Sequence, residues 1–200
     1  MKKLILIIII ACAFICNAYS VDNSSNIKSV KIGNQVWMKG NLDVDHYRNG
    51  DAIPEVKDPA KWKTLTTGAW CYFKNNRGTV GKLYNFYAVN DQRGLAPTGW
   101  HITSADDWEA LTNYFGGDEW QIVIKQKPLI AKETGFFEVG GGLRNSMSSA
   151  DFISGSDGFW SVNNANSPNV MIRRLQSNKV NFTKTNCAKV DGYYVRCIKD

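Results

Sequence analysis

The sequence predicts an α+β fold in a single domain, with one or two early helices packed on short antiparallel strands. Three observations predict it. A capped helical segment begins near residue 104, short apolar segments separated by turn residues follow Pro128, and about 180 residues remain after an N-terminal signal, enough for one core. With 44% hydrophobic and 21% charged residues, the composition is that of an ordinary globular protein.

Residues 1–20 are expected to be a signal peptide. A Lys-Lys start precedes an apolar run over residues 4–15, and Ala18 and Ser20 fit the positions before a cleavage site. The run is shorter than the roughly 20 residues of a membrane-spanning helix. We therefore expect an exported protein, secreted or at the cell surface, without a transmembrane segment.

A lipoprotein is the alternative. Residues 9–12, Ile-Ile-Ala-Cys, resemble a lipoprotein cleavage box that would leave a lipid anchor at Cys12, although the apolar residues after Cys12 favour simple cleavage. Residues 21–29 are polar and rich in Asn and Ser, so we expect a flexible leader there, followed by one domain over 30–200.

The charge pattern does not indicate a nucleic-acid partner. The formal net charge is +6, and removal of Lys2 and Lys3 with the signal would leave +4. The basic residues are scattered, without a run of five, so neither nucleic acid nor a membrane surface is indicated as a partner.

The domain opens with a predicted β-hairpin. Residues 30–38 alternate apolar and polar residues on either side of Gly33-Asn34, which is typical of two strands joined by a two-residue turn. The stretch 43–67 is charged, contains two prolines and has little periodicity, so we expect a long surface excursion held by Trp62.

Two aromatic segments follow this excursion. Residues 69–73 predict a short strand that ends in a turn over 75–78. Residues 83–89 fit a helix face and a strand equally well, because their aromatic residues suit both spacings.

The clearest helix begins after Ser104. Ser104 and Asp107 form a capping box, and a glycine pair ends the helical pattern twelve residues later. Trp108, Leu111 and Phe115 share one face, so this face is expected to pack on the core.

Short strands separated by Gly, Asn and Ser are expected in the second half of the chain. They are residues 136–139, 158–162, 170–175, 179–182 and 193–198. The glycine run 140–142 is expected to form a tight bend rather than a phosphate-binding loop, since no strand–helix unit flanks it.

No catalytic or metal-binding motif is present in the sequence. Its two histidines, His46 and His101, lie more than 50 residues apart, and we expect His101 to be a hydrogen-bonded structural imidazole. We expect no catalytic residue, no metal ligand and no cofactor. Paired carboxylates of a polysaccharide-acting enzyme can meet only in three dimensions, so that activity stays an alternative.

Three cysteines lie beyond the signal, at positions 71, 187 and 197. In an oxidising compartment one disulfide is expected, with either Cys71 or Cys187 as the partner of Cys197. Three unpaired buried thiols are the alternative.

Asparagines are concentrated in residues 161–187. Asn side chains donate and accept hydrogen bonds, which suits sugar hydroxyls beside an aromatic ring, although Asn is also common in exposed loops. The candidate ligand contacts are Trp160, Asn163, Asn164, Asn166, Asn169 and Arg173.

Several segments together resemble the Fibrobacter succinogenes major paralogous domain family, whose members are secreted or surface proteins. The matching segments are residues 30–42 (VKIGNQVWMKGNL), 81–89 (GKLYNFYAV), 96–111 (APTGWHITSADDWEAL), 141–144 (GGLR), 159–161 (FWS) and 192–200 (GYYVRCIKD). The resemblance implies a C-type-lectin-like fold over the whole mature chain.

The resemblance also implies structural roles for particular residues. Those matching family aromatics, expected in the core, are Trp37, Trp100 and Trp108, and those matching polar positions, expected in buried hydrogen bonds or charge pairs, are Asn41, His101, Glu109, Arg144 and Arg196. Ala96 stands where relatives often have a cysteine, which weakens the disulfide prediction. Calcium motifs of lectins are absent from the sequence.

The favoured hypothesis is a non-catalytic extracellular or cell-surface binding module for a glycan or protein ligand, since rigid scaffolds carry ligand contacts on their loops. One alternative is a structural or adhesion component of a surface layer or appendage. The other is a polysaccharide-acting enzyme.

Overall fold

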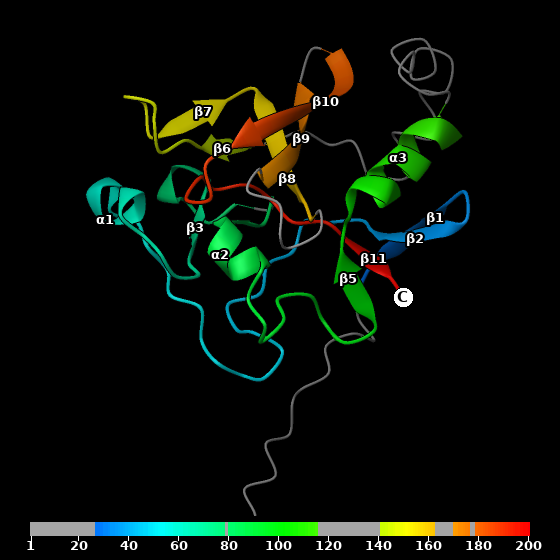
Figure 1. Ribbon diagram of the computed structural model, residues 1–200, viewed down its shortest axis with the longest axis horizontal. Coiled ribbons are helices and arrows are strands. Elements are labelled where there is room, and N and C mark those ends of the chain that lie inside the picture. Colours follow the sequence, from blue (N-terminus) through cyan, green and yellow to red (C-terminus); the bar gives the residue numbers. More distant parts are fainter. Residues whose placement is uncertain (1–26, 79, 116–140, 163–169, 177–178) are drawn as a thin grey trace, which may run out of the picture.

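Short strands and three short α-helices form the part of the chain that the computed structural model describes, residues 27–78, 80–115, 141–162, 170–176 and 179–200 (Figure 1). The helices are α1 (Pro59–Lys63), α2 (Phe86–Val89) and α3 (Ala105–Tyr114). The strands are β1 (Ser29–Ile32), β2 (Gln35–Met38), β3 (Trp70–Tyr72), β4 (Lys82–Tyr84), β5 (Trp100–Ile102), β6 (Gly142–Arg144), β7 (Phe152–Ser154), β8 (Ser156–Ser161), β9 (Val170–Gln176), β10 (Lys179–Cys187) and β11 (Cys197–Lys199). The presence of both helices and strands confirms the predicted α+β class.

Antiparallel pairing brings distant parts of the chain together. A four-stranded sheet has the order β1-β2-β11-β5, so the last strand lies between the opening hairpin and the strand before α3 (Figure 1). A three-stranded sheet has the order β10-β9-β8, and β3-β4 and β6-β7 form two further pairs.

The opening hairpin is confirmed. Val30 pairs with Trp37 across a two-residue turn in which Gly33 has a φ of +59°, a left-handed conformation that favours glycine. The predicted leader ends earlier than expected, because Ser29 already pairs with Met38 in β1. Residues 1–26, which include the predicted signal, lie outside the described residues.

Helix α3 is confirmed with its capping box. The Ser104 side chain accepts a hydrogen bond from the Asp107 backbone N–H (3.1 Å), and the Asp107 carboxylate accepts one from the Ser104 N–H (2.8 Å). Trp108, Leu111 and Phe115 are buried, as the face of the helix predicts.

The ambiguous segment 83–89 contains both structures. Strand β4 ends at Tyr84, and the Asn85 side chain caps α2 by accepting a hydrogen bond from the Ala88 N–H (3.0 Å). Helix α1 lies within residues 43–67, where the sequence predicted an irregular surface segment and no helix. Asp58 caps it and Pro59 occupies its first turn, so the Asp-Pro pair was the available signal.

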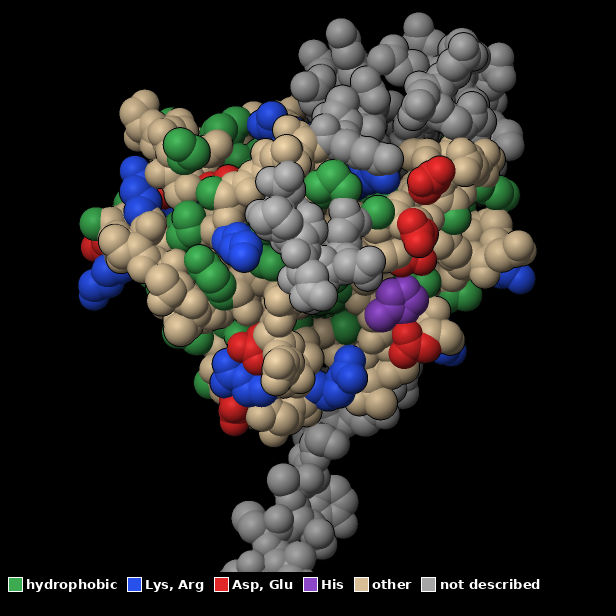
Figure 2. All heavy atoms as spheres, viewed as in Figure 1, with side chains coloured by type: hydrophobic (Ala, Val, Ile, Leu, Met, Phe, Trp, Pro, Cys, Tyr) green, Lys and Arg blue, Asp and Glu red, His purple; other side chains and the backbone are tan. Residues whose placement is uncertain are grey.

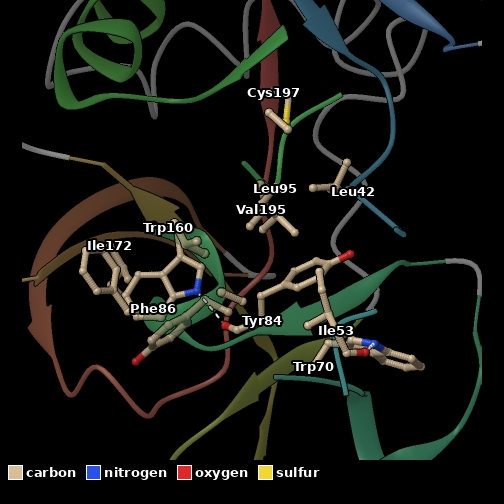
Figure 3. Close-up of a cluster of buried hydrophobic side chains, with 14 of the residues drawn as sticks. Leu42, Ile53, Trp70, Tyr84, Phe86, Leu95, Trp160, Ile172, Val195 and Cys197 are labelled. Atoms are coloured by element: carbon tan, nitrogen blue, oxygen red, sulfur yellow. Dashed lines mark hydrogen bonds between the residues drawn. The ribbon is translucent and has the colours of Figure 1, made fainter. Parts of the chain in front are cut away.

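Two aromatic clusters form the core. In one, the buried Trp160 indole donates its N–H to the Tyr84 carbonyl (2.7 Å) and packs on Phe86, with ring centroids 5.4 Å apart (Figure 3). In the other, Trp37 packs on Trp108 with ring centroids 5.1 Å apart.

The late strands differ from the prediction in extent. Strands β8, β9 and β10 are present, but the last strand covers only Cys197–Lys199, while Tyr193 and Tyr194 form single bridges. Gly142 begins β6 rather than a bend, since it pairs with Ser154 of β7. A Cβ there would clash with the Ile153 carbonyl, so the close approach of β7 requires glycine at this position. The predicted strand 136–139 lies outside the described residues.

The predicted disulfide is not formed, since Cys71, Cys187 and Cys197 are free thiols. Cys71 belongs to the core cluster of Trp108, whereas Cys197 belongs to that of Trp160. Within the described ranges, no helix combines the length and apolar composition needed to cross a membrane.

Candidate functional site

The predicted ligand contacts around Trp160 do not form a surface. Trp160 is 0% exposed and Arg173 is 5% exposed, so neither can act as an open platform for a ligand. Both lie in the interior because their strands, β8 and β9, are covered by other elements, which a strand sequence alone does not reveal. Asn163, Asn164, Asn166 and Asn169 lie outside the described residues.

Arg144 links three segments in the interior. Its guanidinium, 0% exposed, makes a bidentate pair with Asp151 (2.9 Å for both bonds) and stacks on Trp62, with 4.4 Å to the ring centroid. It also donates to the carbonyls of Val56 (2.7 Å) and Lys57 (2.9 Å). These contacts give Arg144 a structural role.

Arg196 has a similar role beside β2. It donates to the Asn41 side chain (2.6 Å) and to the carbonyls of Met38 (3.0 Å) and Lys39 (2.7 Å). Burial lowers its pKa to about 10, and the nearby Asp157 carboxylate acts in the opposite direction. Asn41 in turn donates to the Val80 carbonyl (2.7 Å).

Glu109 differs from Arg144 and Arg196, which are buried. It is exposed on α3, next to the buried Trp108. Successive helical residues point about 100° apart, so burial of Trp108 turns Glu109 to the solvent. The expected buried contact of Glu109 is therefore wrong.

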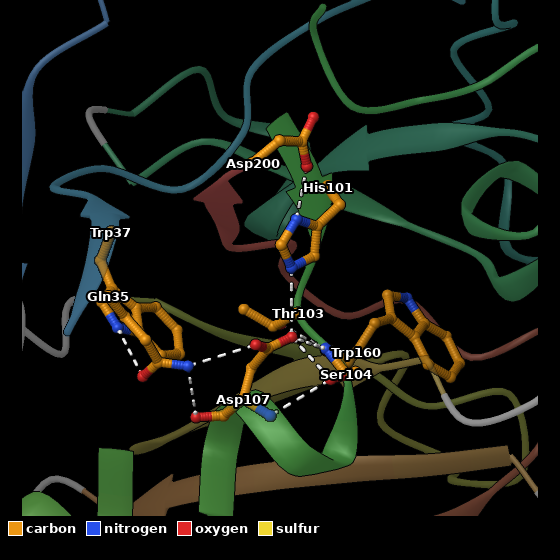
Figure 4. Close-up of polar contacts among 8 residues, drawn as sticks. All are labelled: Gln35, Trp37, His101, Thr103, Ser104, Asp107, Trp160 and Asp200. Carbon is orange, nitrogen blue, oxygen red and sulfur yellow. Dashed lines mark hydrogen bonds and ion pairs between the residues drawn. The ribbon is translucent and has the colours of Figure 1, made fainter. Parts of the chain in front are cut away.

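His101 joins two carboxylates at the partly exposed end of β5. One ring nitrogen lies 2.7 Å from Asp200 and the other 3.3 Å from Asp107 (Figure 4). Asp107 also accepts hydrogen bonds from Ser104 (2.6 Å) and Gln35 (3.2 Å). One ring nitrogen thus links β5 to α3, and the other links β5 to Asp200, which follows β11.

A groove lined mostly by polar residue types lies beside α2. This α2 groove, with a volume of about 500 Å³, is lined by residues 66–68, Phe86, Tyr87, residues 90–93 and Lys189. Two threonines, Asn90, Gln92 and the half-buried Tyr87 therefore line a common opening. None of these residues was a sequence candidate, because they come from three segments without a shared motif.

The floor of the α2 groove is held by buried contacts. Asn85, fully buried, accepts from the Ala69 N–H (3.0 Å) and donates to the Thr67 carbonyl (2.8 Å), which fixes the 66–68 loop to the start of α2. At Gly68 a Cβ would lie 2.0 Å from the Tyr47 hydroxyl, so this loop approaches Tyr47 closely.

Ionised groups occupy one end of the groove. Arg93 donates to Asp91 (2.9 and 2.8 Å) and to Asp51 (3.0 Å), and its guanidinium lies 4.0 Å from the Tyr47 ring centroid. The hydrogen bond with Arg93 is the main reason that the pKa of Asp91 is lowered to about 2, and the pKa of Asp51 is lowered for the same reason. Both carboxylates are ionised at neutral pH and act as fixed acceptors.

A second, smaller pocket ends at Tyr194. This Tyr194 pocket, of about 210 Å³, is lined by Phe73, Lys74, Asn76, Gly78, Val80, Gly81, Gly141 and Tyr194. Tyr194 is 0% exposed, and its hydroxyl makes no hydrogen bond of acceptable geometry within the described residues. Burial raises the pKa of this hydroxyl, so it stays protonated at neutral pH.

The rim of the Tyr194 pocket contains strained backbone. Lys74 (φ +52°, ψ +28°) and Asn75 (φ +53°) both adopt left-handed conformations, which cost a non-glycine residue about 1–2 kcal/mol.

We expect the substitution Lys74→Gly to raise the free energy of unfolding by about 0.5–1 kcal/mol. Glycine adopts a positive φ without the Cβ clash, and its greater freedom in the unfolded chain offsets part of the gain. Urea denaturation measures the change. The control Lys61→Gly, in helix α1, is expected to lower stability by about 1 kcal/mol, and a loss at Lys74 of similar size would contradict the strain.

Charges of both signs are interspersed over the face seen in Figure 2, which agrees with the scattered charge pattern of the sequence. In the described ranges, no group of three or more His, Cys, Asp or Glu side chains is placed to hold a metal ion.

The fold and these pockets define a small α+β domain with a hydrogen-bonded aromatic core and polar openings between its loops. The chain belongs to the Fibrobacter succinogenes major domain (Fib_succ_major) family, which matches residues 30–199. Comparisons with curated proteins and with solved structures give no match.

Proposed function

We propose that the protein is a non-catalytic binding module that acts outside the cell or at its surface and holds a glycan in the α2 groove. The observation that carries this proposal is that threonine, asparagine and glutamine residues line the same groove as the half-buried Tyr87. Sugars present hydroxyl groups and apolar ring faces, and they are recognised by such polar groups beside an aromatic ring.

The electrostatics of the groove favour binding over hydrolysis. A glycosidase needs a carboxylic acid with a raised pKa close to a second carboxylate. In the α2 groove, the hydrogen bond with Arg93 lowers the pKa of Asp91 instead, and the same arginine lowers the pKa of Asp51, which does not line the groove. Ionised carboxylates fixed in this way suit hydrogen-bond acceptance from sugar hydroxyls.

Export and a lectin-like scaffold form part of the same proposal. The basic start, apolar run and small residues within 1–20 support export, with lipid attachment at Cys12 as the alternative to simple cleavage. The C-type-lectin-like fold is supported by the motif resemblance over 30–200. In such a scaffold the loops around α2 would present the ligand contacts.

The substitution Tyr87→Ala tests the groove. Loss of the ring is expected to weaken binding of the recognised glycan about fivefold, because stacking on an aromatic side chain contributes on the order of 1 kcal/mol. A glycan array with the wild-type protein identifies the ligand, and titration calorimetry then compares the variants.

Tyr114→Ala is the matched control, since Tyr114 is a 49% exposed aromatic residue on α3 that does not line the groove. It is expected to bind the glycan as the wild type does. A wild-type protein that binds no glycan on the array, or a Tyr87→Ala variant with unchanged affinity, would count against the α2 groove as a glycan site.

A further inference from the structure

A mostly apolar groove lies beside the opening hairpin. This hairpin groove, with a volume of about 380 Å³, is lined by Ile27, Lys28, residues 38–44 and Pro97. Met38 and Leu42 are buried members of the core, and the half-buried Ile27 and Val44 pack against the same core (Leu42 is labelled in Figure 3). The groove therefore opens onto apolar side chains at the edge of the core.

Two polar residues of the lining are already engaged within the protein. Asn41 donates to the Val80 carbonyl (2.7 Å) and accepts from Arg196 (2.6 Å). The Asp43 carboxylate pairs with the buried Lys82 ammonium group (2.7 Å), which compensates its charge. A ligand in the groove therefore meets little unsatisfied polarity from Asn41 or Asp43.

Lys28 and Lys39 give the rim of the groove a positive charge. They lie opposite each other at the end of the β1–β2 ladder, where the Lys39 N–H donates to the Lys28 carbonyl (2.9 Å). Both are exposed, and among the described residues neither forms an ion pair. Like charges on facing strand residues are unfavourable, and an anion held between them would remove the repulsion.

A glycine leaves room next to this cationic rim. Gly40 follows Lys39 in the lining, and a Cβ at Gly40 would meet no atom within 4 Å. The apolar space therefore begins directly beside the lysine rim. A molecule with an anionic head and an apolar chain would match both parts at once.

We propose that the hairpin groove binds a fatty acid, with its carboxylate at Lys28 and Lys39 and its alkyl chain against Met38 and Leu42. A methylene group takes up nearly the volume of a water molecule, roughly 30 Å³, so a chain of about twelve carbons fills the 380 Å³. Burial of the chain drives binding, and the two lysines select the anionic head. This site shares no residue with the α2 groove and does not depend on a glycan binding there.

Calorimetric titration of the full chain with dodecanoate, below the concentration at which it forms micelles, tests the proposal. The wild type is expected to bind dodecanoate saturably. Affinity is expected to rise about two- to fourfold for each methylene from octanoate to dodecanoate, and to stay level for hexadecanoate, whose extra carbons extend beyond the groove. Dodecyltrimethylammonium, which has the same chain and the opposite charge, is expected to bind at least tenfold more weakly.

The double variant Lys28→Met, Lys39→Met tests the cationic rim. It is expected to weaken dodecanoate binding at least tenfold, while its Tm stays equal or rises because two facing like charges are removed. Lys31→Met is the matched control, since Lys31 is an exposed lysine of β1 that does not line the groove. This variant is expected to bind dodecanoate as the wild type does.

Gly40→Phe tests the apolar space. The ring is expected to occupy the groove and to weaken dodecanoate binding at least tenfold without a fall in Tm, because a Cβ at this position displaces no atom. Gly78→Phe is the control, since a Cβ at Gly78 also meets no atom within 4 Å and Gly78 lies outside this groove. Tyr87→Ala, in the α2 groove, is likewise expected to bind dodecanoate normally, which distinguishes the two sites.

Four results would overturn the assignment. They are absence of saturable dodecanoate binding by the wild type, equally tight binding of dodecyltrimethylammonium, and unchanged binding by either the double lysine variant or Gly40→Phe. Two other occupants have their own readouts. Tighter binding to phosphatidylglycerol vesicles than to dodecanoate would assign the groove to a membrane surface, and dimers in light scattering that Gly40→Phe abolishes would assign it to a second copy. Either outcome would reject the fatty acid.

Discussion

Replacement of Arg144 by methionine is expected to lower the free energy of unfolding by about 3–5 kcal/mol. The variant leaves the Asp151 carboxylate without its bidentate partner and the carbonyls of Val56 and Lys57 without their donor. Methionine fills part of the space over Trp62 but replaces none of the four hydrogen bonds. Urea denaturation at neutral pH, followed by circular dichroism, measures the loss.

Arg93→Met provides the matched control for this experiment. Arg93 also pairs with carboxylates, Asp91 and Asp51, but its side chain is 41% exposed, so water compensates most of what the substitution removes. A much smaller loss is therefore expected. If the two variants lose equal stability, the buried network around Arg144 does not have the role assigned to it.

The protein is expected to lose stability steeply above pH 9. Burial raises the pKa of Cys71 and Cys197 to about 12, and it raises the pKa of Tyr47 to about 12 from an ordinary value of 10. Burial also raises the pKa of other groups, namely Cys187, Tyr84, Tyr193 and Tyr194. In the unfolded chain these thiols and phenols lose their protons near pH 9–10, whereas the folded chain retains them.

Above pH 9 the unfolded chain therefore binds fewer protons than the folded chain, so the free energy of unfolding falls as pH rises. The stability that these buried thiols and phenols contribute is fully present below pH 9 and is lost as pH approaches 12. Each group that is ionised only in the unfolded chain lowers it by about 1.4 kcal/mol per pH unit. Burial lowers the pKa of Arg196, so this group alone would make the free energy of unfolding rise with pH. Its effect is smaller than the summed effect of the thiols and phenols.

Denaturation with urea at intervals from pH 7 to 11, in the presence of a reductant, measures this fall. Cys71→Ala removes one of the titrating groups and is expected to reduce the slope above pH 9.5 by about 1.4 kcal/mol per pH unit. A stability that stays constant up to pH 11 would contradict the burial of these groups in the folded protein.

Local signals in the sequence were sufficient for local structure. The Ser104 capping box and the Gly33 turn each depend on neighbouring residues, and both elements form as predicted. The segment 83–89 could not be assigned from periodicity, because strand and helix meet within it at Asn85, whose side chain caps α2 through the Ala88 N–H. The same side chain also bonds residues 67 and 69, and these contacts depend on the fold.

The candidate sites could not be predicted from the sequence for the same reason. Trp160 was expected at the surface because asparagines follow it, yet the core packs on both its ring and its indole N–H. The Tyr194 pocket joins the matched segments 81–89, 141–144 and 192–200, so Gly81, Gly141 and Tyr194 lie in resembling motifs. The motifs did not show that these residues enclose a space.

The position of β11 has a consequence for folding during synthesis. This strand lies between β2 and β5, so the four-stranded sheet that joins the opening hairpin to the rest of the domain cannot be completed until residues 197–199 have been synthesised. Until then β2 and β5 each lack the hydrogen-bonded neighbour that β11 provides. For the export proposed above, a sheet that closes this late in synthesis suits translocation of the chain as an unfolded polypeptide.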